Sequence, residues 1–341
     1  MIGLILDTYT LSSSLPESFD IETQEDYVVV AITLQGECIY QTRLYENGGS
    51  CTFYELRQIV EQNMIARHLS LASFEVAVDD GNSWTEIDGK FIIFSRYRNT
   101  EYVDIDFLQA HFLVNRSFYT IPREGHATIP FFATGQENFS VFYDCVFERD
   151  GVLSQYRLDY SMYHYTRPNI YGVSVAPMDI ERWVENEEAE DCGRLLSFTV
   201  HVGSRSLTVY VVEDKPSIAF AFRNSYNAIE TMFVMGTTTL KTEISQKEAV
   251  SLNVTSFYDK SVSRKWQVKT VPLSQEEARW YNEFLESDYV SLNLSQEHND
   301  LRILISDITS EISDSSKDLV HIKFSWRFED NGLWLTEDRF P

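Results

Sequence analysis

The chain has few basic residues for its length. Its 341 residues include 28 Lys and Arg against 52 Asp and Glu, so the formal net charge is −24 at pH 7. A groove for nucleic-acid phosphates needs clustered Lys and Arg, and the sequence has no such cluster. No hydrophobic run approaches the roughly 20 residues of a membrane-spanning helix. We therefore expect no nucleic-acid partner and no membrane insertion.

Cysteines are scarce and widely spaced. Cys38, Cys51, Cys145 and Cys192 form no CxxC pair, which argues against zinc-knuckle and thioredoxin-type sites. Four scattered cysteines in a chain of this size are more often buried thiols than disulfides. The apolar stretch at residues 2–6 is short, and no Lys or Arg precedes it. We therefore expect no signal peptide in this chain.

Catalytic and metal-binding motifs are also lacking. The sequence has no GxSxG, HExxH, P-loop, GxGxxG or EF-hand pattern. None of its seven histidines lies two or four positions from another, so no local pair of metal ligands exists. The many carboxylates are too scattered to nominate a glycosidase pair, which is defined by distance in space. We predict a protein that is not an enzyme, with no catalytic residues, no metal and no cofactor.

Runs that favour β-strands fill most of the sequence. Such runs are rich in Val, Ile, Tyr, Phe and Thr and are bounded by Gly, Asn, Asp and Pro. They are Tyr27–Leu34, Cys38–Leu44, Phe74–Val78, Phe91–Tyr97, Ser140–Phe147, Leu196–Val202, Leu207–Val212, Ile218–Phe222 and His321–Phe328. Asp150-Gly151 between two of these regions is a hairpin signal.

Two segments have the periodicity of short helices, at about 53–67 and 275–286. In the first, Leu56, Ile59, Val60 and Met64 form one apolar stripe. Capping boxes are predicted at Thr52 with Glu55 and at Ser274 with Glu277. Each helix is isolated among strands, which is typical of a helix packed on an antiparallel sheet.

The fold class is therefore predicted to be mainly β, with multi-domain antiparallel sandwiches or barrels and two short packed helices. We place one domain boundary near 117, within the polar stretch Asn115–Pro130, which carries two Pro and one Gly. We place the other near 214, where Glu-Asp-Lys-Pro interrupts two strand runs. The domains are then 1–117 with one helix, 118–214 with an acidic loop at 185–191, and 215–341 with the second helix. Each has an ordinary domain size.

An unusual run of tyrosines supplies the candidate binding residues. Tyr156, Tyr160, Tyr163 and Tyr165 fall within ten residues. On a regular strand Tyr156, Tyr160 and His164 share one face, and Tyr163 and Tyr165 the other. Exposed tyrosines anchor protein interfaces or stack on sugar rings, although tyrosines also line half-buried sheets as ordinary strand formers.

The last third of the chain resembles a known group of proteins. The resemblance covers three segments, residues 220–249, 263–294 and 320–332. In chain order they contain a strand that leads into Arg223-Asn224, the pair Met235-Gly236, a strand with Trp266, a short helix and a final aromatic strand. This order resembles β-rich structural proteins of prophage-type regions in gut Bacteroidetes, similar to phage tail or baseplate components. The resemblance implies no catalytic residues.

Three functions remain open at this stage. The first, which we favour, is a non-enzymatic structural or assembly protein that acts through protein–protein contacts, as a homo-oligomer or a phage-tail-like component. Such a protein would be cytoplasmic before assembly, or associated with a virion or other particle. The second is a carbohydrate-binding protein that uses the exposed tyrosines on a glycan. The third is a glycoside hydrolase, which needs two convergent carboxylates about 5–10 Å apart.

Overall fold

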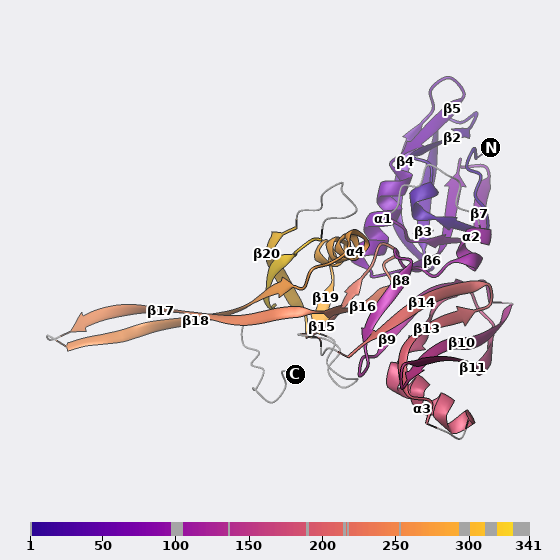
Figure 1. Cartoon of the computed structure of the whole chain (residues 1–341). Coiled ribbons are helices and arrows are strands. Elements are labelled where there is room, and N and C mark those ends of the chain that lie inside the picture. The colour runs from indigo at the N-terminus through magenta and orange to yellow at the C-terminus, as the bar shows by residue number, and fades with distance from the viewer. Residues whose placement is uncertain are drawn as a thin grey trace.

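The structure is a computed structural model that describes residues 2–96, 105–135, 137–188, 191–213, 216, 218–251, 254–292, 301–310 and 319–329. Strands dominate these residues and form six sheets of two to five strands each (Figure 1). The predicted fold class, a mainly β protein of several sheets, is confirmed.

The N-terminal part is a five-stranded sheet beside a two-stranded one. The larger sheet has the order β1-β7-β6-β3-β4, in which β1 and β7 run parallel and the other neighbours antiparallel. Its strands are β1 (Tyr9–Leu11), β3 (Tyr27–Leu34), β4 (Glu37–Tyr45), β6 (Leu71–Asp79) and β7 (Trp84–Ile93), and the smaller sheet pairs β2 (Ser18–Glu22) with β5 (Ser50–Tyr54). Every second residue of β3 is buried, as its alternating sequence requires.

Helix α1 (Leu56–Ala66) supplies one side of the N-terminal core. Leu56, Val60 and Met64 are fully buried and Ile59 packs partly against the same cluster, so the predicted apolar stripe is confirmed. The predicted capping box is wrong. Thr52 belongs to β5, where its hydroxyl donates to the Asp20 carboxylate at 2.7 Å, and the helix follows Glu55 without a side-chain cap.

The middle part is a second five-stranded sheet with the order β11-β10-β13-β14-β8, beside the pair β12-β9. These strands are β8 (Phe118–Pro122), β9 (Ala127–Ala133), β10 (Glu137–Arg149), β11 (Val152–Tyr165), β12 (Asn169–Val175), β13 (Arg194–Val202) and β14 (Arg205–Val212). The hairpin signal is confirmed, because Asp150 and Gly151 join β10 to β11 with positive φ angles of 52° and 79°. Such angles fit a tight hairpin turn.

Two further helices appear that the sequence analysis did not predict, α2 (Ile105–Ala110) and α3 (Pro177–Glu188). The expected acidic loop at 185–191 is wrong for its first four residues, since α3 continues through Glu188. Pro177 opens this helix, a position that Pro favours, and Ile180 and Val184 bury one face a turn apart. Burial of that face outweighs the repulsion between the carboxylates on the other.

The C-terminal part combines the sheets β16-β15-β19 and β17-β18-β21-β20 with α4 (Gln275–Leu285). The strands are β15 (Ile218–Arg223), β16 (Ile229–Val234), β17 (Gly236–Ser251), β18 (Val254–Thr270), β19 (Val290–Leu292), β20 (Ile303–Thr309) and β21 (Lys323–Phe328). The capping box of α4 is confirmed, with Ser274 accepting from the N–H of Glu277 and the Glu277 side chain accepting from Ser274. Its buried face carries Ala278, Tyr281 and Phe284.

One hydrophobic cluster runs through both the middle and C-terminal sheets, and a separate one fills the N-terminal part. Asn227 connects the C-terminal part to the N-terminal part. Its side-chain amide donates to the carbonyl of Leu69 at 2.9 Å, and its own carbonyl accepts from the Ser70 hydroxyl at 2.7 Å. The domain limits at 117 and 214 stay predictions.

Candidate functional site

The tyrosines of β11 do not form one exposed surface. Tyr156 and Tyr165 are partly buried and pack against the main core, and Tyr165 lies with its ring centroid 3.9 Å from that of Tyr171. Tyr160 is exposed, at 39% of its surface. The backbone of Tyr163 pairs with Phe139, but its side chain lies outside the described residues.

A β-bulge explains why Tyr156 and Tyr165 pack on the same side. The register with β10 shifts at this point, since Phe142 faces Asp159 whereas Val141 faces Ser161. The extra residue, Tyr160, reverses which face the later residues occupy. Strict alternation would have put Tyr156 and Tyr165 on opposite faces, and that expectation is wrong.

The feature that stands apart from the body of the protein is a long hairpin. Strands β17 and β18 pair antiparallel from Gly236 opposite Thr270 to Ser251 opposite Val254. Among the described residues, the root of β18, from Trp266 to Lys269, is the part of the hairpin that also pairs with β21. Figure 1 shows the rest of the hairpin projecting away from all other elements. We call residues 236–270 the arm and all other residues the body.

The arm is apolar along one face. Leu240 lies opposite Trp266 and Ile244 opposite Val262, and positions two apart along a strand share a face. Among the described side chains of the arm, four apolar ones are exposed in the single chain, and we call them the apolar stripe. They are Leu240 at 50%, Ile244 at 56%, Phe257 at 59% and Val262 at 38% exposed. An uncovered strand pair with such side chains is a ready association surface.

The arm differs in charge from the body. Its sequence holds six Lys and Arg and three Asp and Glu, a net charge of +3, which leaves −27 for the body. Lys241 and Lys265 face each other at the root, and Lys265 forms an ion pair with Asp307 of β20. Lys247 and Arg264 lie farther out.

A tight root fixes where the arm leaves the body. Gly236 begins β17 with φ 154°, and a Cβ there would lie 2.2 Å from the carbonyl oxygen of Lys269. Only glycine fits this close approach of the two strands. On the other strand Trp266 is 8% exposed and packs into the core. The arm is thus anchored firmly at its root, and its described residues beyond the root pair only with each other.

Beside the root lies a buried ion pair. The Glu230 side chain on β16 is fully buried, and its Oε1 lies 2.7 Å from a guanidinium nitrogen of Arg116, which is 4% exposed. Trp280 donates to Glu230 Oε1 at 2.9 Å and Asn224 donates to Oε2 at 3.0 Å. The Arg116 guanidinium lies over the ring of Trp280, 3.6 Å from its centroid. This network joins the segment just before β8, which carries Arg116, to both β16 and α4.

Burial dominates the protonation of this network. Desolvation lowers the pKa of Arg116 to about 9, although Glu230 and Glu283 act in the opposite direction. Desolvation also raises the pKa of Glu230, while Arg116, Asn224 and Trp280 counteract it. The pKa of Glu283 is raised to about 7 by burial first and by Glu230 second. Arg116 is therefore positively charged at neutral pH, and its charge stabilises the ionised forms of the two buried carboxyl groups, Glu230 and Glu283.

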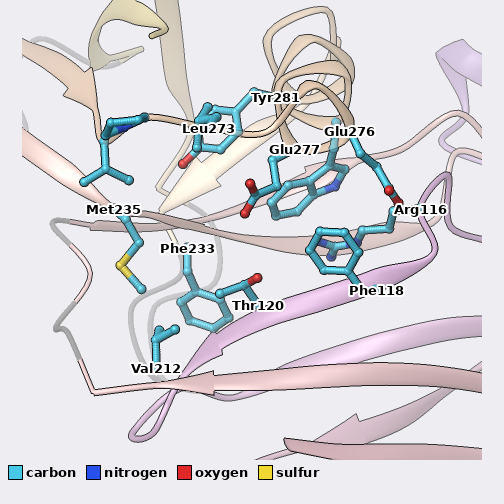
Figure 2. A pocket seen from close by; sticks show the side chains of 13 residues that line it. Arg116, Phe118, Thr120, Val212, Phe233, Met235, Leu273, Glu276, Glu277 and Tyr281 are labelled. Atoms are coloured by element: carbon cyan, nitrogen blue, oxygen red, sulfur yellow. The ribbon is translucent and has the colours of Figure 1, made fainter. Parts of the chain in front are cut away.

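A small pocket opens next to Arg116 (Figure 2). Its volume is about 210 Å³, and it lies between β8, the end of β16, the segment after β18 and α4. Phe233, Met235 and Leu273 make its wall apolar, whereas Glu276 and Glu277 of α4 lie at one side. The pocket thus has an apolar wall, with Arg116, Glu276 and Glu277 as its charged groups.

Within the described ranges, no group of three or more His, Cys, Asp or Glu side chains is placed to hold a metal ion. None of the helices in the described part of the chain is both long and apolar enough to cross a membrane. Cys51, Cys145 and Cys192 are buried and Cys38 is exposed, and none of the four forms a disulfide.

Comparison with known proteins identifies no family. No protein-family model and no curated protein matches the chain. Among solved structures, native E. coli alpha-2-macroglobulin is similar over 79% of this chain and 21% of its own, at 6% identity and a TM-score of 0.20. This chain therefore spans about a fifth of the length of that protein.

Proposed function

We propose that this chain is a non-enzymatic structural or assembly protein that acts through protein–protein contacts, and that the arm is its contact element. The projecting arm is the observation that carries this proposal. Its strands extend over about 50 Å at roughly 3.3 Å per residue. Apart from the root, the described residues of the arm make strand pairs only with each other. An element of this shape adds little to the stability of its own chain. Its apolar stripe is covered by a partner in the function that we propose.

The resemblance of the last third to tail and baseplate proteins agrees with this function, because the resembling segments include β17 from Gly236 to Ala249. We therefore propose a phage-tail-like assembly as the setting and particle association as the final location. The partners are other proteins of that assembly or further copies of this chain.

Removal of the arm tests this function. Lys241 and Lys265 face each other in the ladder, so a two-residue Asn-Gly turn can replace residues 242–264. This armless variant keeps the anchoring Trp266, and it keeps the net charge because the deleted segment holds three basic and three acidic residues. We expect the full chain, but not the armless variant, to bind purified products of neighbouring genes or itself in light scattering. A full chain that stays monomeric and binds none of them contradicts the function.

A carbohydrate-binding function remains the second candidate, on one observation. Tyr160 of β11 and Trp183 of α3 lie side by side, with ring centroids 4.9 Å apart, and are 39% and 37% exposed. Paired exposed aromatics can stack on a sugar ring. A glycan array with the wild type and Trp183→Ala tests it, and retention of a glycan by the wild type alone would favour it.

A further inference from the structure

We propose that a pocket where the three parts of the body meet binds a small organic molecule through its phosphoryl group. The pocket, which we call the junction pocket, has a volume of about 370 Å³. Its wall comes from the segment that joins α1 to β6, from the paired strands β9 and β12, and from β15 and β16 with the turn between them. None of the described residues that line it belongs to the arm. This inference therefore goes beyond the proposed function and can fail without affecting it.

The junction pocket is basic, although the chain as a whole is acidic. Its described lining residues include Arg223 and His68 but no Asp or Glu. The chain, in contrast, holds 52 Asp and Glu against 28 Lys and Arg. The side chain of Arg302, just before β20, lies beside His68, with a guanidinium nitrogen 3.4 Å from Nε2 of the ring. Two arginines and one histidine thus give this junction a local positive charge, which favours an anion.

These basic side chains repel one another, and no described carboxylate is paired with them. Burial lowers the pKa of Arg223, Tyr289 acts in the opposite direction, and Arg302 lowers it further. Burial also lowers the pKa of His68, and both arginines add to that effect. In the described part of the chain, neither Arg223 nor Arg302 forms an ion pair. A bound anion would replace the repulsion by attraction.

The same side chains have hydrogen-bond donors to spare. Arg223 donates from Nη1 to the carbonyl of Asn227 at 2.7 Å, whereas its Nε is buried without an acceptor among the described residues. An arginine can only donate, so Nε2 of His68 accepts from Arg302, and the neutral ring carries its proton on Nδ1. A phosphoryl group brings three acceptor oxygens and a charge of about −1.5 to −2, so it can accept from a guanidinium and an imidazole together.

The rest of the wall suits an organic group attached to the phosphoryl group. Leu69, Leu71, Pro130 and Ile170 are among the apolar residues that line the pocket. Its volume of about 370 Å³ is in the range of small-molecule pockets, about 300–1,000 Å³, and exceeds what a phosphate ion fills. We therefore expect a phosphomonoester of a small, partly apolar molecule to bind more tightly than inorganic phosphate.

Calorimetric titration of the full chain with three probes tests the ligand class. Phenyl phosphate carries both the charge and an apolar group, inorganic phosphate carries the charge alone, and phenol carries the apolar group alone. We expect phenyl phosphate to bind most tightly, inorganic phosphate more weakly and phenol not at all. Equal affinity for the two phosphates would make the free ion the ligand and overturn the organic part of the proposal. Binding of phenol as tightly as phenyl phosphate, or no binding by either phosphate, would overturn the site.

Variants of the basic side chains locate the binding. Arg223→Met should weaken the binding of phenyl phosphate at least about tenfold, because it removes a charged donor from the pocket wall. His68→Asn with Arg302→Met changes two exposed residues, and it gives a second test if the first variant folds poorly. We expect a similar loss from that pair. Arg182→Met, on the exposed side of α3, changes net charge as Arg223→Met does and should bind as the wild type does. Equal weakening by Arg182→Met would show an effect of net charge and overturn the site.

The His68 ring gives a readout that a purely structural role for these residues would not move. A bound phosphoryl group favours the imidazolium form, so the pKa of His68 should rise when phenyl phosphate saturates the protein. NMR titration of the histidine rings measures this change, with His68→Asn identifying the signal. The ring signals of His201, on β13 and outside the pocket lining, should not respond to the ligand. Binding that leaves the His68 titration unchanged would place the ligand elsewhere and overturn the proposal.

Discussion

Trp266 of the arm root stacks on Trp326 of β21, with ring centroids 4.3 Å apart and ring planes 9° apart. The two residues are also direct partners in the ladder, and Leu240 completes the row on the other side of Trp266. Trp326 is fully buried, Trp266 is 8% exposed and Leu240 is 50% exposed. One row of the sheet thus passes from the core to the surface, and Trp266 is the last well-buried residue among the described side chains along the arm from its root outward.

Trp266→Ala should therefore destabilise the protein by about 3–5 kcal/mol, because it removes a stacked, buried side chain. Leu240→Ala, one position along the same row, should cost less than about 1 kcal/mol in the monomer because the side chain is half exposed. Urea unfolding of both variants measures the difference. Similar losses would mean that the outer part of the arm is packed against the body.

The Arg116–Glu230 pair predicts strong coupling between two variants. Glu230→Gln leaves a buried guanidinium without its carboxylate, and Arg116→Met leaves a buried carboxylate without its cation. Each should lower the free energy of unfolding by about 3–5 kcal/mol, and the double variant should lose much less than the sum. Arg157→Met is the control, because Arg157 and Asp144 form an exposed pair that solvent screens, so its loss should change stability little. Additive losses for the first pair would contradict the buried contact.

Glu283 predicts a dependence of stability on pH. Burial and the Glu230 carboxylate raise the pKa of Glu283 from 4.5 to about 7. The folded state therefore binds the proton more tightly than the unfolded state, so this group lowers the free energy of unfolding as pH rises between those values. Glu283→Gln should become more stable relative to wild type over that interval, by up to about 3 kcal/mol.

Urea unfolding at several pH values measures this difference. Glu286→Gln, on the exposed C-cap of the same helix, should follow the wild type at every pH. A constant difference between Glu283→Gln and wild type from acid to neutral pH would show that Glu283 ionises normally in the folded state.

Leu56 tests the packing of α1. Its side chain is fully buried in the N-terminal core, so Leu56→Ala should cost about 2–5 kcal/mol. Gln58→Ala, exposed on the same helix, should change stability by less than about 0.5 kcal/mol. Thermal or urea unfolding gives both values, and a small loss at Leu56 would mean that this helix face is not part of the core.

The sequence determined the features that depend on neighbouring residues. The stripe on α1 follows from spacing along the helix, and the capping box of α4 joins residues three positions apart. The turn at Asp150 and Gly151 needs only two residues that tolerate positive φ. Charge composition likewise belongs to the sequence, and it shows an acidic chain with a basic segment at 236–270.

Features that join distant segments were decided by tertiary structure alone. Thr52 has the spacing of an N-cap, but pairing of β5 with β2 brings Asp20 to its hydroxyl instead. The bulge at Tyr160 depends on register with β10, so the sequence could not show that Tyr165 turns inward. The arm gave little sequence signal of a strand, because a hairpin exposed on both faces lacks the alternation that a half-buried strand requires. Only the placement of the other sheets determined that the described residues of the outer hairpin pair with no other strand.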